Sequence, residues 1–408
     1  MRVLVVAQYY TPEPVPKPSD VAEELTRRGH SVTVLTGLPN YPSGVLAPGY
    51  KMTPRLRESI DGVPVLRVFE YPYHGRSAVG RALNYISFSI AAAAAAYAVP
   101  RPDVMYVFIP PPTLGVSAWF LGALRRAPFI CDVQDIWPDE AIMSGILHEG
   151  VVASALRIVE RFVYAKASHL LVATDGARSN LLRKGIAPKK VTVLPHWYPM
   201  ARTFEGPTPE FLDRGRRELQ ASDRFVVTFA GNLGILQGLS TVLDAAERLR
   251  PRRDIGFRFI GEGLDRRRLE DLAAKKGLDN VLFLDRRSPA EVAPLLAASD
   301  CLLVHAVPGP LQEIALPTKT LAYLAAGRPV IAAMDGATAA LIREADAGVT
   351  TSPGDSAALA DAINRLSTTP RADLDAMGAR GRRFVAERFD KRRIMDRLEA
   401  VLEGHARR

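Results

Sequence analysis

The sequence predicts an α/β protein built from two doubly wound parallel sheets. Short runs rich in β-branched residues alternate along the whole chain with segments of helical length, the pattern of strands joined by crossover helices. The chain has 408 residues, which suits two domains better than a single core. Apolar residues make up 48% and charged residues 24%, the balance of a globular protein.

The two predicted domains cover residues 1–200 and 201–385. Strands of the first are expected at residues 3–8, 31–36, 63–69, 104–108, 128–133, 169–174 and 191–195. Those of the second are expected at residues 224–230, 257–260, 281–284, 301–305, 329–332 and 348–352. The segment after PHWYPM carries Pro, Gly and charge without a strand pattern, which places the boundary there. A last helix, at about residues 386–408, is expected to pack back on the first domain.

Cysteine use and the N-terminus indicate a cytoplasmic protein. Cys131 and Cys301 each adjoin an apolar run, so both are expected to be buried and reduced. The apolar run of MRVLVVAQYY is too short for a signal peptide and lacks a cleavage pattern, so it is read as the first strand.

The net charge of +9 indicates an anionic partner or surface. Nucleic acid is not expected, because aromatic residues make up 7% and no nucleic-acid motif is present. Between Arg81 and Arg101 lie 19 uncharged residues, six of them consecutive alanines, which predict a buried or membrane-surface helix rather than a span. Trp119 and Phe120, with two arginines after them, suggest peripheral contact with an anionic membrane.

Glycine-rich loops in the second half suggest a phosphate site, because ligands of open α/β sheets bind beyond the carboxyl ends of the strands. Gly231, Asn232 and Gly234 follow one predicted strand and precede a helix, where backbone amides could hold a diphosphate. Gly261 follows the next strand in the same way. For both loops a plain strand-to-helix turn is the alternative.

A lysine marks the third loop of this half. In LPTKTLAYLAAGRPVIAA, Thr318 and Lys319 stand at a predicted helix start. A lysine there opposes the helix dipole, so an anionic ligand is expected to compensate it, a surface lysine being the alternative.

The first half carries a cluster of acidic residues in CDVQDIWPDE. Asp132, Asp135 and Asp139 follow an apolar run, so they are expected to face a cleft, a cation or sugar hydroxyls. Asp135 is the preferred contact for the acceptor or the reacting sugar, and Trp137 offers a ring for a sugar face, although a core tryptophan is the alternative. His196 ends the last strand of this half and is an acceptor-side candidate. No histidine accompanies the carboxylates, and no metal site is predicted.

Several motifs, each weak by itself, together identify one protein family because of the order in which they occur. They are VAQYYTPEP, GLPNYPSG, QDIWPDEAI, AGNLGILQGL, the LPTKTLAYLAAGRPVIAA block and MGARGRRFVAERF. The chain resembles a retaining glycosyltransferase of family 4 with the GT-B fold, and especially the subgroup similar to WbuB-type enzymes of bacterial surface-polysaccharide assembly. The resemblance implies two Rossmann-like domains facing a cleft. It also implies a nucleotide-diphospho-sugar donor, often UDP-linked, and an acceptor that is a lipid-linked or polysaccharide precursor.

The chain departs from the family at its donor site. The family's two donor-binding glutamates fall on Ile314 and Ala322, and Glu313 is the candidate substitute for the first. The family's basic pair falls on Asn232 and Gln237. The expected site therefore consists of Lys319 and the 231–234 amides, with Arg286 or Arg287 near the base or phosphates.

The resemblance implies retention, with the leaving phosphate accepting the acceptor's proton, so that neither a side-chain nucleophile nor a metal or other cofactor is expected. A nucleotide-sugar epimerase, a non-catalytic GT-B subunit or binding module, and a glycosyltransferase of secondary metabolism remain alternatives.

Overall fold

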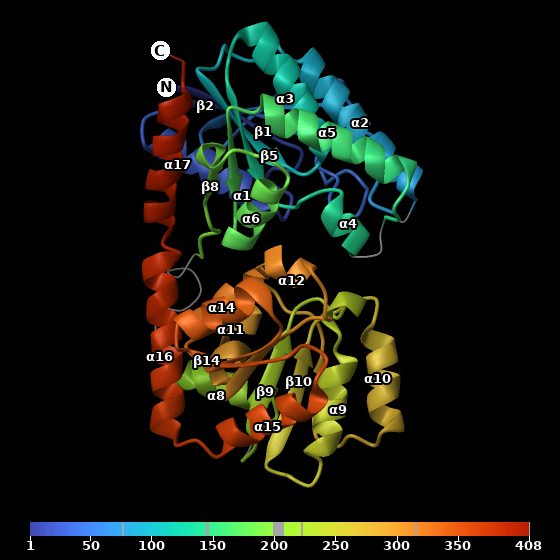
Figure 1. Cartoon of the computed structure of the whole chain (residues 1–408), viewed down its shortest axis with the longest axis vertical. Coiled ribbons are helices and arrows are strands. Elements are labelled where there is room, and N and C mark those ends of the chain that lie inside the picture. Colours follow the sequence, from blue (N-terminus) through green and yellow to red (C-terminus); the bar gives the residue numbers. More distant parts are fainter. Residues whose placement is uncertain (76, 144–146, 199–207, 222, 315, 408) are drawn as a thin grey trace. The chain divides into compact units, whose positions relative to one another are not determined.

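The computed structural model describes residues 1–75, 77–143, 147–198, 208–221, 223–314 and 316–407. The chain divides into two compact units: Met1–Pro195 with Arg392–Arg408, and His196–Lys391. The expected boundary at residue 200 lies outside the described residues. Each unit contains a parallel or largely parallel sheet with helices beside it, which confirms the predicted fold class (Figure 1).

The sheet of the first unit has eight strands in the order β3-β4-β2-β1-β5-β6-β7-β8. Neighbouring strands are parallel except β3 and β4, which are antiparallel. The strands are β1 (Arg2–Ala7), β2 (Ser31–Gly37), β3 (Arg55–Ile60), β4 (Val63–Val68), β5 (Val104–Ile109), β6 (Phe129–Val133), β7 (His169–Val172) and β8 (Val191–Val193). The α-helices are α1 (Pro16–Arg27), α2 (Ala78–Ala94), α3 (Pro112–Arg125), α4 (Asp139–Met143), α5 (Val151–Lys166), α6 (Asp175–Arg183) and α17 (Lys391–His405).

Strand β3 is the one that the sequence pattern does not predict. Its residues, RLRESI, alternate between exposed and half-buried at the sheet edge, so it lacks the apolar run of the other strands. Asp61 and Gly62, with φ of 50° and 79°, join it to β4. An Asp-Gly pair between two alternating runs is a strong hairpin signal, and it could have revealed this strand.

The second unit has six strands in the order β11-β10-β9-β12-β13-β14, all neighbours parallel. The strands are β9 (Phe225–Ala230), β10 (Ile255–Ile260), β11 (Val281–Leu284), β12 (Cys301–His305), β13 (Val330–Ala333) and β14 (Gly348–Thr351). The α-helices are α8 (Pro209–Glu218), α9 (Ser240–Arg248), α10 (Arg266–Lys275), α11 (Pro289–Ala298), α12 (Leu311–Ile314), α13 (Thr318–Ala325), α14 (Gly336–Glu344), α15 (Ser356–Ser367) and α16 (Arg371–Arg388). The six strands expected here are all present.

This second sheet separates two hydrophobic cores. Val226 of β9 packs in a cluster with residues of α11 and α13, whereas the next residue, Val227, packs in a cluster with residues of α9 and α15. Successive side chains of a strand point to opposite faces, so both faces are covered by helices. A ligand therefore has access mainly at the ends of the strands.

The two cysteines and the long uncharged segment were also the subject of expectations. Cys131 and Cys301 are both buried and unpaired, as predicted. The long uncharged segment forms α2, and no helix in the described part of the chain has the length and apolar character needed to cross a membrane.

Candidate functional site

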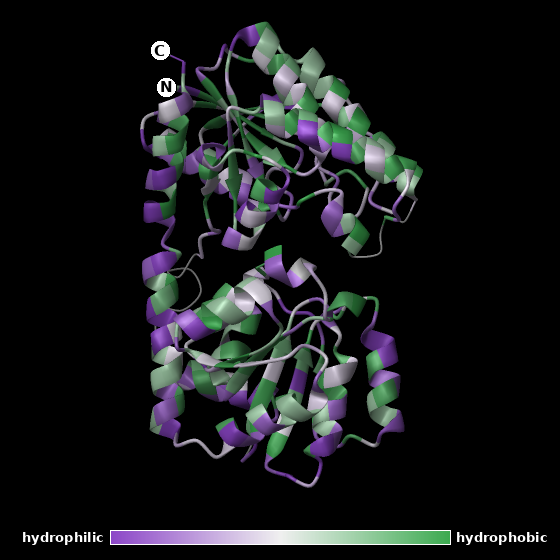
Figure 2. Cartoon of the chain, viewed as in Figure 1, coloured by the Kyte–Doolittle hydropathy of each residue, from purple (hydrophilic) through white to green (hydrophobic). Residues whose placement is uncertain are grey.

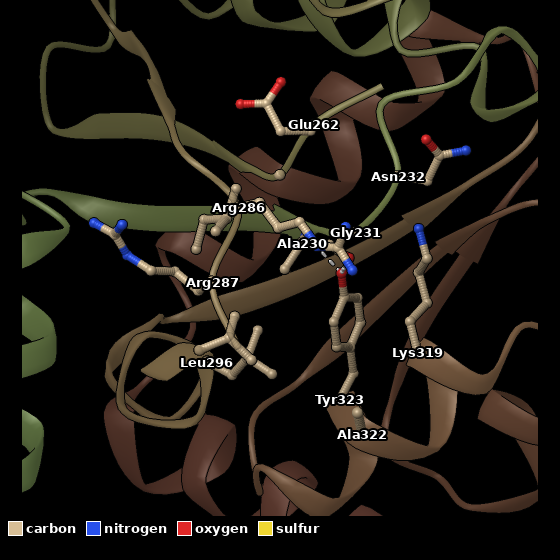
Figure 3. A pocket seen from close by; sticks show the side chains of 13 residues that line it. Ala230, Gly231, Asn232, Glu262, Arg286, Arg287, Leu296, Lys319, Ala322 and Tyr323 are labelled. Carbon is tan, nitrogen blue, oxygen red and sulfur yellow. Dashed lines mark hydrogen bonds between the residues drawn. The ribbon is translucent and has the colours of Figure 1, made fainter. Parts of the chain in front are cut away.

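A cavity of about 420 Å³ lies at the carboxyl ends of three adjacent strands, β9, β10 and β11 (Figure 3). Helices α11 and α13 complete its walls. The lining residues are Ala230, Gly231, Asn232, Ile260, Gly261, Glu262, Arg286, Arg287, Val292, Leu296, Lys319, Ala322 and Tyr323. Six of the residues expected at the donor site therefore come together, from four separate segments.

Two glycines form the cavity wall where β9 and β10 end. Gly231 and Gly261 have φ of 140° and 144°, a region that favours glycine. A Cβ atom on Gly261 would lie 1.9 Å from the carbonyl oxygen of Gly231. The two backbone segments can pass this closely only because Gly261 has no side chain, and the wall there is bare backbone.

Two of the amides of residues 231–234 are not available for the expected diphosphate cradle. The Gly231 amide donates to the Ile260 carbonyl at 2.8 Å, and the Leu233 amide donates to the Glu262 carbonyl at 2.8 Å. The Gly261 amide is likewise engaged, by the Leu284 carbonyl at 3.0 Å. The expectation was wrong for these amides, because the close approach of neighbouring strand ends already uses them.

Lys319 is the second residue of α13, and its ammonium group faces the cavity. Its Nζ atom donates to Gln237 Oε1 at 3.2 Å and lies 4.0 Å from the centroid of the Phe229 ring. Burial lowers the pKa of Lys319 to about 8. No carboxylate among the described residues forms an ion pair with it, so an anionic ligand would find an uncompensated cation here.

The two arginines after β11 differ in their surroundings. Arg287 pairs with Glu218 at 2.7 Å and points away from Lys319 (Figure 3). Arg286 is exposed and points into the cavity. Glu262, the only carboxylate among the lining residues, pairs with Arg266 and points away from Lys319. Among the described lining residues, Arg286 and Lys319 are therefore the two cations that no carboxylate pairs with.

Three other expected donor residues do not line the cavity. Gly234 precedes the short 3-10 turn Ile235–Gln237, Thr318 is the exposed first residue of α13, and Glu313 is exposed on α12. Nothing in this geometry supports Glu313 as a substitute for a missing glutamate. Of the two positions where the family has glutamates, Ile314 is buried and Ala322 lines the cavity.

Tyr323 is a site residue that the sequence reasoning missed. Its hydroxyl accepts a bond from the Ala230 amide at 2.7 Å and donates to the Ala230 carbonyl at 2.8 Å, which fastens α13 to the end of β9. Residues three and four positions apart share a helix face, so Ala322 and Tyr323 could have been inferred from Lys319.

His305, which the sequence reasoning missed, contacts Gln237, the second position of the family's basic pair. The Gln237 carbonyl accepts a bond from Nδ1 of His305 at 2.7 Å, while its side chain holds Lys319. Burial lowers the pKa of His305, so the imidazole is neutral at neutral pH. A histidine that ends an otherwise apolar strand was the available signal.

In the first unit, Asp132, Asp135 and Asp139 have different surroundings and do not form a single acidic site. Asp132 is buried, forms an ion pair with Lys17 at 2.8 Å and accepts a bond from the Tyr106 hydroxyl. Asp139 pairs with Lys184 at 2.8 Å. Both carboxylates thus face a cation, as one alternative of the expectation had it, and in each case the cation is a lysine of this chain.

Asp135 differs from its neighbours, because it has no ion pair with a described residue. Burial raises the pKa of Asp135. Burial, with Asp135 and Asp139 nearby, also raises the pKa of Glu140 to about 7. Trp137, between these carboxylates, is half-buried, and half-buried His196 is the first residue of the second unit.

A buried polar cluster after β4 was not predicted. Oε1 of Glu70 accepts bonds from the side-chain amides of Gln8, Asn40 and Asn84 at 2.7 to 2.9 Å. Burial raises the pKa of Glu70 to about 8, and its Oε2 has no partner among the described residues. Gln8, Asn40 and Glu70 follow strands β1, β2 and β4, whereas Asn84 lies on α2. The three residues that follow strands form a polar edge on the same side of the sheet as Asp135.

One group of side chains has the spacing of a metal site. Ligand atoms of His30, Glu399 and Glu403 lie within 4.8 Å of one another. The guanidinium of Arg28 already lies 2.6 Å from Glu399, and His30 bonds to the same carboxylate. These groups join α17 to the first unit and form an ion-pair network, not part of the cavity described above.

Two family models match this chain. The one described as glycosyl transferase 4-like domain matches residues 18–197, and the one described as glycosyl transferases group 1 matches residues 224–369. The chain belongs to glycosyltransferase family 4. It is therefore an enzyme of the transferase class, and the family resemblance is confirmed.

Relatives and solved structures agree with this assignment. The protein designated colanic acid biosynthesis glycosyl transferase WcaI, from Escherichia coli K12, is 28% identical over 336 residues, which is 80% of this chain and 82% of the relative. The alpha-D-kanosaminyltransferase of Streptomyces kanamyceticus is 25% identical over 55% of this chain and 57% of its own length. The structure of Anabaena HepE in complex with UDP has a TM-score of 0.76 at 18% identity, covering 99% of this chain and 100% of HepE. This glycosyltransferase thus has the GT-B fold.

Proposed function

We propose that this glycosyltransferase moves a sugar from a UDP-sugar to a lipid-linked or polysaccharide acceptor with retention of anomeric configuration. The observation that carries the proposal is the pair of cations, Lys319 and Arg286, in the cavity beyond β9, β10 and β11. A volume of about 420 Å³ suits a small-molecule ligand, and the cations suit an anionic one. The structural neighbour HepE holds UDP, which supports a uridine nucleotide as the donor's leaving group.

The chemistry follows from what the cavity offers. The bond between the sugar's anomeric carbon and the diphosphate oxygen breaks, and a bond to the acceptor oxygen forms. The acceptor's proton passes to a leaving phosphate oxygen, so atoms and charges balance without a side-chain nucleophile. Lys319 and Arg286 stabilise the negative charge that grows on the diphosphate, a task for which positioned cations are effective. In this proposal the cations of the protein make a metal or other cofactor unnecessary.

The acceptor is assigned to the first unit. Asp135, a half-buried carboxyl without an ion pair to a described residue, would bind the acceptor or the reacting sugar. Trp137 would offer a ring face to a sugar. The name of the relative WcaI refers to colanic acid, a product that supports an acceptor in polysaccharide assembly. We place the reaction in the cytoplasm, at the inner face of the cell membrane.

Donor binding and transfer can be tested separately. Calorimetry with UDP should give saturable binding, and a panel of nucleotide sugars should stabilise the protein unequally against heat, the true donor most. Incubation with that donor and a lipid-linked acceptor should yield a product whose anomeric configuration, determined by NMR, matches that of the donor. Absence of binding to every nucleoside diphosphate would contradict the proposal. Conversion of the UDP-sugar to an epimer without any acceptor would contradict it equally.

A further inference from the structure

Helix α2 exposes its large aliphatic side chains, whereas a helix that packs on a globular core usually buries them. Its buried residues are Gly80, Asn84, Phe88, Ser89 and Ala92, most of them small or polar. Its largest aliphatic side chains, at spacings of three and four residues, are 47% to 69% exposed: Val79, Leu83, Ile86 and Ile90. Residues at this spacing form one stripe along a helix. The stripe is therefore apolar and faces solvent.

The neighbouring helices extend this apolar surface. Helix α3 packs against both α2 and α5, and the Trp119 ring on α3 meets Phe162 on α5 edge-on at 5.1 Å. Exposed apolar side chains on these helices, and just after α2, are Tyr97, Trp119, Phe120, Leu124, Val151, Val152 and Ile158. Figure 2 shows α2, α3 and α5 as three adjacent, largely hydrophobic helices. We call this surface the α2/α3/α5 face.

The charges on this face are mostly positive. Residues 71–131 contain a single acidic residue, Asp103, which is bound to Arg2 at 2.7 Å. The only acidic residue of α5, Glu160, is buried and bound to Lys184 at 2.5 Å. Basic residues on the same helices or at their ends are Arg81, Arg125, Arg126, Arg157, Arg161 and Lys166. Among these, Arg157 is paired with Glu149, just before α5, at 2.5 Å. The face thus combines exposed apolar groups with an excess of positive charge.

We propose that the α2/α3/α5 face docks on an anionic lipid bilayer. The aliphatic stripe of α2 would enter the boundary between headgroups and acyl chains, and the basic residues would meet the lipid phosphates. Trp119 and Tyr97 have the amphipathic rings that favour this depth. A second copy of the chain fits less well, because it would bring the same positive charges to the interface. The proposal goes beyond sugar transfer, and its test uses neither donor nor acceptor.

The test is flotation of the full chain with two kinds of vesicle. We expect the protein to float with phosphatidylcholine vesicles that contain about one third phosphatidylglycerol, less so in high salt, and weakly with phosphatidylcholine alone. The variant Leu83→Gln/Ile86→Gln/Ile90→Gln should reduce the floated fraction at least about tenfold, since binding scales with buried apolar area. Arg161→Gln/Lys166→Gln should reduce flotation with the anionic vesicles selectively.

A matched control uses three exposed aliphatic residues outside this face, in the variant Val45→Gln/Ile235→Gln/Leu264→Gln. These side chains are 68% to 79% exposed, so their replacement changes the same kind of surface. We expect wild-type flotation from this control and unchanged thermal unfolding from every variant. Failure of the wild-type protein to float, or equal loss in the control and the α2 variant, would overturn the proposal. Dimerisation without lipid that the α2 variant abolishes would overturn it too, because the face would then bind protein.

Discussion

The ammonium nitrogen of Lys319 lies 4.0 Å from the centre of the Phe229 ring and 3.2 Å from Oε1 of Gln237. The ring face and the amide oxygen both favour a cation, while burial and the start of α13 disfavour it. No described carboxylate neutralises this charge. The missing negative charge is what we assign to the donor's diphosphate.

Lys319→Met should raise the Kd for UDP at least tenfold, which corresponds to about 1.4 kcal/mol, because the change removes the charge while keeping the length of the side chain. Calorimetry of the two proteins measures it. Lys275→Met removes the charge of an exposed lysine on α10 and should bind UDP normally. Wild-type affinity in Lys319→Met would remove Lys319 from the donor site.

UDP binding should weaken as the pH rises above about 8. In the free enzyme the pKa of Lys319 is lowered to about 8 by burial. A bound diphosphate favours the charged amine and raises that pKa, so binding above pH 8 requires uptake of a proton and the association constant falls by up to tenfold per pH unit. Calorimetry at pH 8 in two buffers of different ionisation enthalpy should detect about half a proton taken up. Lys319→Met should show no uptake, and pH-independent binding by the wild-type enzyme would contradict the assignment.

Gly261→Ala should destabilise the second unit and weaken donor binding. The new Cβ would lie 1.9 Å from the Gly231 carbonyl oxygen at a φ of 144°, so the strand ends must separate at a cost of about 1–3 kcal/mol. Chemical denaturation, monitored by the loss of helical circular dichroism, measures the change. Gly309→Ala is the matched control, because nothing lies within 4 Å of its Cβ position. Equal stability of the two variants would show that β9 and β10 are less closely packed than described.

Asp135→Asn should abolish transfer while UDP binding is retained. The substitution keeps the shape of a half-buried side chain that makes no ion pair with a described residue, so the fold should tolerate it. Product formation measured with the donor in excess, together with UDP calorimetry, separates the two effects. Loss of UDP affinity would instead connect Asp135 to the donor.

The β-branched runs and the glycine positions were enough to predict the α/β class, all six strands of the second sheet and most of the first. Such runs can be recognised from neighbouring residues alone. A strand that is buried on both faces needs a nearly continuous apolar run, so its sequence is distinctive. Strand β3 escaped because an edge strand with charged residues carries no apolar run, although its Asp61-Gly62 turn is visible in the sequence. The same reasoning found Lys319, since a lysine that opposes a helix dipole is a local anomaly.

No local sequence pattern could show which polar groups are already hydrogen-bonded or ion-paired within the protein. The Gly231 amide is bound to Ile260, Asp132 to Lys17 and Arg287 to Glu218, each through a contact between segments distant in the sequence. The exposed apolar face of α2 likewise became visible only once the packing of α3 showed which side is buried. A residue's type and neighbours along the chain determine what it is able to bind. Only the folded chain determines whether that capacity is left for a ligand, because hydrogen bonds and ion pairs within the protein compete for the same atoms.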